Sequence, residues 1–432
     1  MKNGPDLRRV VSIFIMAFAA SLGASAASIS PHSVNRLSKP KSGAVVESTH
    51  TQRRLNHVRH TRRLVRASVH TTSVGHVAAS PATVGHATLR RASVRRAGVR
   101  HSYGERFNTS SFAEDQTLGD VTTGEDPVVR QAAIDALGNM NGTVVAIDPA
   151  SGRILAMVNQ KLALSAGATP CSTIKVPVAL AALSENLINK DTKVLLSKTW
   201  GLTLTEALAH SNNAYFEAVG RKLGFEKYSY YAHQFGLGEM AGWNVRGEHR
   251  GTFPSEPLDE KLGGVGKMCS FGESISMTPL QLGAIVSAIA NGGTLFYLQH
   301  PETPEEQVNF QPKVKRHLDI GPIVPQISAG MAGAVQYGTA RSLRLNFSEE
   351  QVLGKTGTCS NNAGTRYGWF ASFANTSVGR VVVVVFLEGG RSTFGPKAAE
   401  LAGHVYRNLY DHNFFAARAA ITPVRTAAGA SQ

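Results

Sequence analysis

A strongly basic segment near the N-terminus, residues 28–103, limits how much of this chain can build a folded core. It holds 14 Lys or Arg against one acid, Glu47, and is otherwise rich in Ser, Thr, Val and His. No helical or strand period persists through it, and so much like charge with so few large apolar residues cannot bury a core. We therefore predict a disordered tether over residues 28–125 and a folded domain that begins near Asp126.

The high net charge of the chain comes from this same end. Of the 45 basic and 30 acidic residues in the sequence, residues 1–103 contain 17 basic and two acidic ones, which leaves 28 of each. The part that can fold is therefore neutral, although the whole chain has a formal charge of +15. A second interpretation of the tether is a basic arm that binds an anionic membrane or a wall polymer.

The first 27 residues have the pattern of a targeting segment. Three basic residues within the first nine are followed by an uncharged run over residues 10–22 and by Ala24 and Ala26, spaced A-x-A. Such a run is too short to span a bilayer comfortably. We predict a cleaved secretory signal, with an uncleaved membrane anchor as the alternative. Either one exports the chain to the periplasm or another extracytoplasmic compartment, where nucleic acid is not expected as a partner.

Beyond the tether, strand patterns lie at both ends of a helical region. Residues 143–158, TVVAIDPASGRILAMV, are two apolar runs joined by hairpin turn chemistry. Residues 379–390, GRVVVVVFLEGG, form a β-branched run bounded by glycines, which predicts a strand buried on both faces. This arrangement predicts one α/β domain over residues 126–412, followed by a loose tail over 413–432. Helical patterns lie at 176–187, 204–223, 279–290 and 396–410.

The stretch ATPCSTIKVPVALAAL, residues 168–183, places Ser172 and Lys175 three residues apart at the start of a predicted helix. Positions i and i+3 share a helix face, so the hydroxyl and the amine can meet. A lysine can take the proton of a serine if burial or a second cation lowers its pKa. The pattern is weak alone, because Ser38 to Lys41 in the tether also matches S-x-x-K.

Two further patterns follow. Ser211-Asn212-Asn213 begins 39 residues after Ser172, inside the helical pattern at 204–223. It can relay a proton and hold a substrate amide, or it can simply cap a helix. Lys355-Thr356-Gly357-Thr358 occurs once and enters an apolar stretch. There the lysine adds a cation, the glycine lets a substrate backbone lie along the strand edge, and the threonines offer hydroxyls.

S-x-x-K, S-x-N and K-T-G in this order resemble the active-site set of penicillin-binding proteins and serine β-lactamases. Residues 146–158 resemble the opening hairpin of the transpeptidase domain, 272–295 its Thr-Pro-x-Gln helix, and 354–358 its third strand. The resemblance covers about residues 126–410. It implies an antiparallel sheet flanked by helices with a helical insertion, a penicillin-binding transpeptidase or β-lactamase-like α/β (α+β) fold.

The resemblance also implies a role for each matched residue. Ser172 would be the acylated nucleophile and Lys175 its general base, and the backbone N–H groups of Ser172 and Thr358 would form an oxyanion hole. Peptidoglycan stem peptides would be the substrates and β-lactams the covalent inhibitors, with no metal or cofactor. The other matched side chains would relay a proton and hold the substrate amide (Ser211, Asn213) or hold its carboxylate (Lys355, Thr356, Thr358).

Several readings of the function stay open. A peptidoglycan D,D-transpeptidase is favoured by Asn213, by the Thr-Pro-x-Gln helix and by the 144-residue step from Ser211 to Lys355. A D,D-carboxypeptidase or a class D-like β-lactamase is the first alternative, because STIKVPVAL resembles the class D nucleophile helix. A non-catalytic β-lactam sensor or wall-binding scaffold is the second, and a chance match on an unrelated fold is the third. The step from Ser172 to Ser211 is shorter than is usual in the family.

The chain has three cysteines, so an oxidising compartment permits one disulfide and leaves one thiol. Cys171 directly precedes Ser172, and Cys359 directly follows Thr358. These placements resemble the cysteines that form a disulfide in class A carbapenem-hydrolysing β-lactamases. The resemblance implies a bridge between Cys171 and Cys359 with Cys269 free; the alternative is two small buried thiols.

Overall fold

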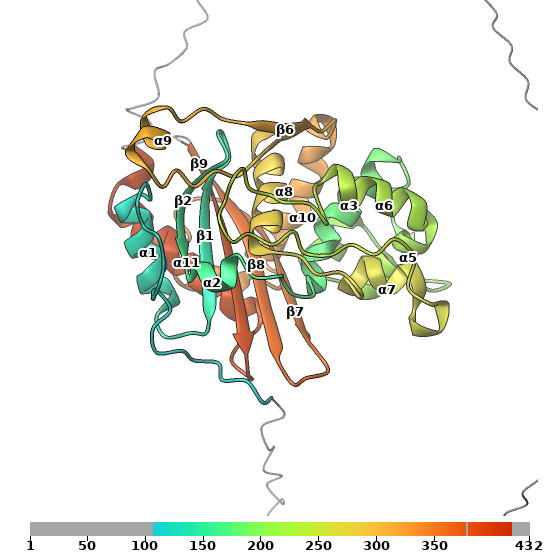
Figure 1. The fold of residues 1–432 in the computed structure, drawn as a ribbon. Helices are drawn as coiled ribbons and strands as arrows, with labels where there is room; N and C mark the ends of the chain where they lie inside the picture. Colours follow the sequence, from blue (N-terminus) through green and yellow to red (C-terminus); the bar gives the residue numbers. More distant parts are fainter. Residues whose placement is uncertain (1–106, 377–378, 417–432) are drawn as a thin grey trace, which may run out of the picture. The chain divides into compact units, whose positions relative to one another are not determined.

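A five-stranded antiparallel sheet forms the centre of the folded unit (Figure 1), as the computed structural model shows for residues 107–376 and 379–416. The strand order is β2-β1-β9-β8-β7, which leaves β7 at one edge. Residues 1–27 and most of the predicted tether lie outside the described residues. The strands are β1 (Gly142–Asp148), β2 (Arg153–Val158), β7 (Val352–Ser360), β8 (Arg366–Thr376) and β9 (Gly379–Gly389).

Strand β9 is buried on both faces, as predicted from its β-branched run. Val381, Val383 and Val385 pack into one core, and Val382 and Val384 into the other, because side chains alternate across a strand. One core lies beneath α1 (Pro127–Leu137) and α11 (Gly395–Asp411), and the other beneath α8 (Pro279–Asn291). The fold predicted for this part of the chain, an antiparallel sheet flanked by helices, is confirmed.

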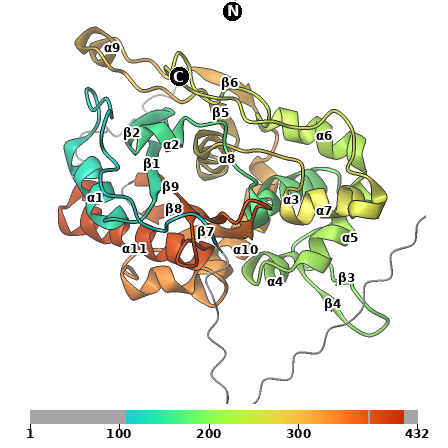
Figure 2. The same ribbon diagram turned by 60° about the horizontal axis from the view of Figure 1, so that its bottom comes forward.

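The helical insertion lies beside the β7 edge of the sheet (Figure 2). Its main helices are α3 (Lys175–Ser184), α4 (Leu204–Ala209), α5 (Asn213–Leu223), α6 (Phe225–Gln234) and α7 (Gly264–Phe271), and α10 (Val324–Gln336) packs on α4 and β7. The shorter elements are α2 (Gln160–Ala163), α9 (Pro304–Val308), η1 (Cys171–Ile174), η2 (Glu260–Leu262), η3 (Gly321–Ile323), η4 (Arg341–Leu345), β3 (Val194–Leu195), β4 (Gly201–Leu202), β5 (Thr294–Phe296) and β6 (Val314–His317).

The helical pattern at 204–223 does not form one helix. Helix α4 ends at Ala209 and α5 begins at Asn213, with Ser211 at a φ of 55° between them. Asn212 is the N-cap of α5, and its side chain accepts a hydrogen bond from the N–H of Tyr215. A short polar side chain that bonds the backbone in this way competes with helix continuation. The prediction of an unbroken helix here was wrong, while the capping interpretation holds for Asn212.

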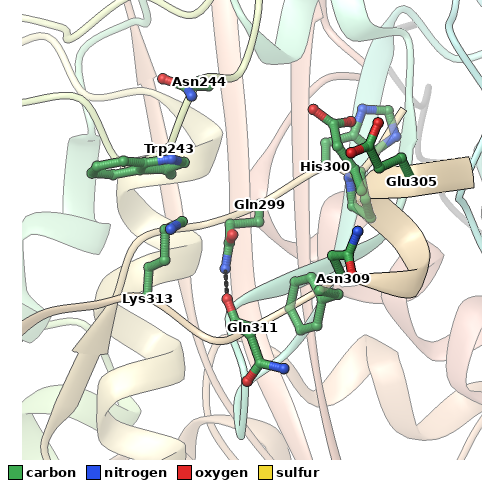
Figure 3. Close-up of a pocket in the computed structure, with 11 residues that line it drawn as sticks. Trp243, Asn244, Gln299, His300, Glu305, Asn309, Gln311 and Lys313 are labelled. Atoms are coloured by element: carbon green, nitrogen blue, oxygen red, sulfur yellow. Dashed lines mark hydrogen bonds between the residues drawn. The ribbon is translucent and has the colours of Figure 1, made fainter. Parts of the chain in front are cut away.

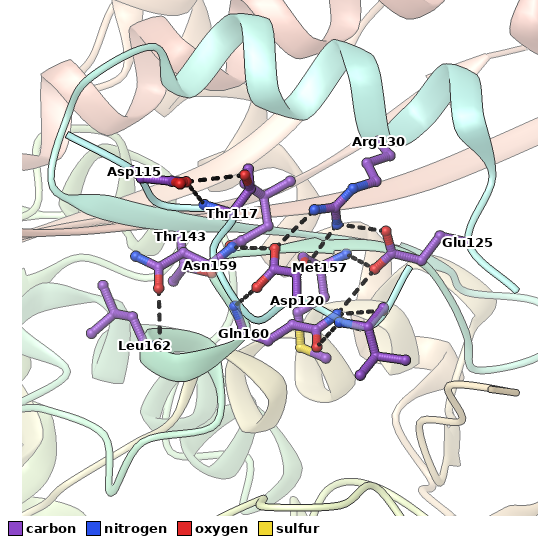
Figure 4. A network of polar contacts seen from close by, with 12 residues as sticks. Asp115, Thr117, Asp120, Glu125, Arg130, Thr143, Met157, Asn159, Gln160 and Leu162 are labelled. Atoms are coloured by element: carbon purple, nitrogen blue, oxygen red, sulfur yellow. Dashed lines mark hydrogen bonds and ion pairs between the residues drawn. The ribbon is translucent and has the colours of Figure 1, made fainter. Parts of the chain in front are cut away.

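Residues 107–125, predicted as part of the tether, belong to the folded unit. Asp120 accepts hydrogen bonds from the N–H groups of Asn159 and Gln160 and pairs with Arg130 at 2.9 Å (Figure 4). Glu125 pairs with the same guanidinium at 2.7 Å. Both acid side chains are at most 3% exposed. The predicted boundary at residue 126 was therefore too late, because it relied on composition and missed two buried acids.

The folded domain also ends slightly later than the predicted residue 412. Phe414 and Phe415 are buried in the core beneath α11, so packing extends past residue 412. Among residues 107–376 and 379–416, no helix combines the length and the apolar character needed to cross a bilayer.

Candidate active site

The structure brings S-x-x-K and S-x-N together around the amine of Lys175. Ser172 lies in η1, Lys175 begins α3, and Asn213 begins α5. The Nζ atom of Lys175 is 2.6 Å from Ser172 Oγ, 2.8 Å from Asn213 Oδ1 and 2.6 Å from the carbonyl oxygen of Ser270. The lysine side chain is fully buried, while Ser172 is half-buried. The serine therefore lies at the surface of the site and the lysine behind it.

These three contacts match the donors and the acceptor of a neutral amine, the form that can act as a base. A neutral amine has two N–H hydrogens and one lone pair. The carbonyl of Ser270 and the amide oxygen of Asn213 can only accept, so they take the two hydrogens. The lone pair is then directed at the third partner, the hydroxyl of Ser172, which can donate its proton.

Burial favours this neutral form. It lowers the pKa of Lys175 to about 7 from an ordinary value of 10.5, and the charge of Glu217 acts in the opposite direction. The rings of Phe216 and Phe271 lie 5.8 and 5.7 Å from the Nζ atom and exclude water from it. The amine is therefore desolvated but not paired with a carboxylate by any salt bridge among the described residues.

The K-T-G lysine reaches the same region from the edge strand β7. The Nζ atom of Lys355 is 2.8 Å from Ser211 Oγ and 2.8 Å from the carbonyl oxygen of Thr356. The lysine is buried. The pKa of Lys355 lies well below its ordinary range, mainly because the amine is buried and secondly because of the charge of Lys175. Two lysines and two serines thus form two adjoining hydrogen-bonded pairs, Ser172 with Lys175 and Ser211 with Lys355.

The two threonines of the K-T-G strand differ in their environment. Thr356 is buried, and its hydroxyl lies 2.6 Å from that of Thr339. Thr358 is half-buried, and its hydroxyl accepts a hydrogen bond from the N–H of Gly395 at 2.8 Å. Because that hydroxyl accepts from the protein, its own hydrogen remains for another acceptor.

Sequence reasoning missed Thr339. Its N–H donates to the carbonyl of Ala209 at 3.1 Å, so it links the end of α4 to the K-T-G strand. A Cβ on the preceding Gly338 would lie 2.1 Å from the same carbonyl oxygen. The only signal in the sequence is a glycine after a helical stretch, which ordinarily marks a helix end.

Gly357 allows the nucleophile turn to lie against β7. A Cβ at this position would be 2.9 Å from the carbonyl oxygen of Pro170 and 3.2 Å from a methyl group of Thr173. Any larger residue would push η1 away from the edge strand. The predicted role of Gly357 in admitting a substrate backbone stays a prediction.

The predicted disulfide is present. Cys171 and Cys359 are bonded, with their Cα atoms 5.5 Å apart. Cys269 is free and buried, and burial raises the pKa of its thiol. The bridge joins the residue before Ser172 to the residue after Thr358, so it connects η1 to β7 at the site itself. Among the described residues, no group of three or more His, Cys, Asp or Glu side chains could hold a metal ion.

The model of the penicillin binding protein transpeptidase domain matches residues 142–411. The chain belongs to the penicillin-binding protein transpeptidase family. This confirms the family that the three motifs resemble, and the matched range includes every motif residue named above. The described residues that precede it, 107–141, supply α1 and the segment that contains Asp120.

Named relatives agree with this assignment. Stage V sporulation protein D of Bacillus subtilis is 29% identical over 315 residues, which are 61% of this chain and 48% of that protein. Peptidoglycan D,D-transpeptidase PbpA of Mycobacterium tuberculosis is 26% identical over 380 residues, 72% of this chain and 76% of that protein. The chain therefore spans about half of the first relative and three quarters of the second.

Solved structures confirm the fold. Penicillin binding protein 3 of Mycobacterium tuberculosis, complexed with aztreonam, superimposes with a TM-score of 0.53 at 21% sequence identity. The match covers 66% of this chain and 76% of that one.

Proposed function

We propose that this protein is a serine D,D-transpeptidase of peptidoglycan. The observation that carries the proposal is the 2.6 Å contact between Ser172 Oγ and a buried lysine amine whose pKa is lowered to about 7. An ordinary surface lysine would be charged at neutral pH and unable to accept a proton. The names of the relatives and the family of the domain support the same reaction class.

In the proposed reaction, Ser172 Oγ attacks the carbonyl carbon of the peptide bond that precedes a terminal D-alanine. Its proton passes to the Nζ atom of Lys175, and the carbonyl oxygen becomes an oxyanion held by the N–H groups of Ser172 and Thr358. When the intermediate collapses, the C–N bond breaks and the leaving nitrogen receives a proton through Ser211 and the lysines. An acceptor amine then repeats the attack on the serine ester and restores the free hydroxyl.

The terminal carboxylate of the substrate would be held at the K-T-G strand. The N–H groups of the Lys355 amine can donate to the carboxylate, and Thr358 retains a hydroxyl hydrogen for the same anion. Thr356 would act with Thr339, since their hydroxyls are bonded to each other. β-Lactams carry a carboxylate beside a strained amide, so we propose that they acylate Ser172 and remain bound.

We also propose that the protein works outside the cytoplasm. The disulfide between Cys171 and Cys359 supports this, because disulfides persist in oxidising compartments. The basic residues 28–103 would then bind anionic membrane or wall polymer, where their charge favours retention.

Labelling with a fluorescent penicillin tests the function. We expect one adduct per chain by intact mass, located on Ser172, formed within minutes and lost over hours. Ser172→Ala should fold normally and take no label. Rapid loss of the adduct would instead indicate a β-lactamase, and a wild-type chain that takes no label would indicate a scaffold.

A further inference from the structure

A cavity separate from the catalytic motifs combines an exposed tryptophan with a set of planar polar groups. It has a volume of about 370 Å³ and lies between Trp243 and the loop from Gln299 to Lys313. Figure 3 shows Trp243 and Lys313 on one side, His300, Glu305 and Asn309 on the other, and Gln299 and Gln311 between them. None of the motif residues of the active site lines it.

The tryptophan is held in place although it is exposed. Trp243 is 44% exposed, and its backbone N–H donates to the carbonyl of Leu298 at 2.8 Å. Tyr297 packs edge-on against its ring at a centroid distance of 5.3 Å, and the amine of Lys313 lies 4.7 Å from the ring centroid. The Lys313 amine therefore lies over one face of the ring, and the part of the ring that stays exposed is available to a ligand.

The other side chains that line the cavity indicate which class of ligand it binds. Four amide side chains line the cavity, and each offers both a donor and an acceptor. The amide of Gln299 is fixed by a bond from its Nε2 to the carbonyl of Gln311 at 2.9 Å, which uses one of its two N–H hydrogens. Carboxylates of Glu305 and Glu306 add acceptors and disfavour an anion. The four amides belong to Asn244, Gln299, Asn309 and Gln311.

A sugar ring has the complementary chemistry. Its flat face presents C–H groups, which the negative face of an aromatic ring attracts, and its rim presents hydroxyls that both donate and accept. A site for a phosphate needs a cluster of cations, and a site for an apolar ligand needs a wall of aliphatic side chains. The residues that line this cavity provide neither. We infer that this cavity binds a saccharide unit of the glycan strand of peptidoglycan, outside the catalytic centre.

A second cavity neighbours the first. It has a volume of about 530 Å³ and shares the buried side chain of His300 with the first. Lys161 and Arg246 line it beside the acid Glu302, so it offers two cations to the carboxylates of peptide branches on the same strand. The inference that the saccharide belongs to peptidoglycan rests on the proposed function. The inference that the ligand is a saccharide rests on the residues that line the first cavity.

Calorimetric titration of the full chain with a hexamer of β-1,4-linked N-acetylglucosamine tests the inference. We expect saturable binding, and Trp243→Ala should raise the Kd about tenfold or more, since a stacked aromatic contact is worth roughly that factor. Asn309→Ala should weaken binding in a chain whose tryptophan is intact. Trp200→Ala is the matched control, because Trp200 is 50% exposed on the β4 side of the insertion and should bind the hexamer like wild type.

The outcomes separate this inference from the proposed function. Absence of saturable binding, or an unchanged Kd in both Trp243→Ala and Asn309→Ala, would overturn the saccharide site even if penicillin still labels Ser172. Binding of a stem peptide free of sugar in competition with the hexamer would also overturn it. If the chain binds the hexamer but penicillin does not label it, the saccharide site is supported and the proposed transpeptidase function is contradicted.

Discussion

The pH dependence of acylation tests whether Lys175 is the base. Only the neutral amine can take the proton of Ser172, so the acylation rate should follow the neutral fraction. With a pKa of about 7, roughly half of the lysine is neutral at pH 7. With the ordinary value of 10.5, about one molecule in 3,000 would be neutral. Burial is therefore worth a factor of about 1,500 in the population of active enzyme at pH 7.

The assay is the second-order rate of acylation by a fluorescent penicillin between pH 5.5 and 9. We expect the rate to rise about tenfold per pH unit below pH 6, to reach half its maximum near pH 7 and to level off above pH 8. The carboxylate of the penicillin stays ionised over this range, so it does not contribute. A rate that is flat over the whole range would remove Lys175 as the base, and a rate that still climbs tenfold per unit at pH 9 would refute the effect of burial.

A pair of variants on neighbouring helices sharpens this test. Glu217 raises the pKa of Lys175 by its charge, so Glu217→Gln should move the midpoint of the profile to lower pH. Glu226 is exposed on α6 and does not act on Lys175, so Glu226→Gln should leave the midpoint in place. Equal midpoints in the two variants would contradict the proposed electrostatics.

Three further predictions concern stability and positioning. Cys359→Ser should lower the free energy of unfolding by about 2–5 kcal/mol in denaturant titrations, whereas reductant should not alter the stability of that variant further. Asp120→Ala should lower the free energy of unfolding by about 3–5 kcal/mol, because it removes a buried carboxylate from Arg130 and from two N–H groups. A decrease of less than about 1 kcal/mol would mean that residues 107–125 contribute little to the fold. Thr339→Val should slow acylation about tenfold, because the buried hydroxyl of Thr356 loses its hydrogen-bond partner. Thr339→Ser keeps the hydroxyl and should restore the rate. Equal acylation rates in the two variants would mean that Thr339 contributes only by packing.

Local patterns in the sequence identified the residues of the candidate site, but not the backbone that places them. Ser172, Lys175 and Lys355 were found because each motif has a fixed spacing and a residue type that the reaction needs. The break at Ser211 was missed because apolar periodicity continues across it. Only the hydrogen bond that Asn212 accepts from the N–H of Tyr215 shows that the helix restarts. Thr339 was missed for a different reason: its partner, Thr356, lies 17 residues away on another element, and no local pattern encodes that contact.

The same reasoning explains why the N-terminal boundary was misplaced. Composition separates a basic segment from a neutral one, yet residues 107–125 are polar and still fold. Their contribution comes from Asp120 and Glu125, which satisfy backbone N–H groups of β2 and the start of α2 and share one guanidinium. Buried acids are rare, so a composition argument treats an acid as a surface residue by default.

The nucleophile and the K-T-G strand belong to parts of the chain that local interactions do not connect. Cys171 and Cys359 are 188 residues apart, and the proposed oxyanion hole takes one N–H from each side of the bond between them. Two features hold the sides together: the disulfide, and the absence of a side chain at Gly357, which lets η1 lie against β7. A pair of N–H donors stabilises an oxyanion only when their separation is fixed before the reaction. In the proposed mechanism the disulfide therefore contributes to positioning as well as to stability, since it ties η1 to the strand beside the proposed oxyanion hole.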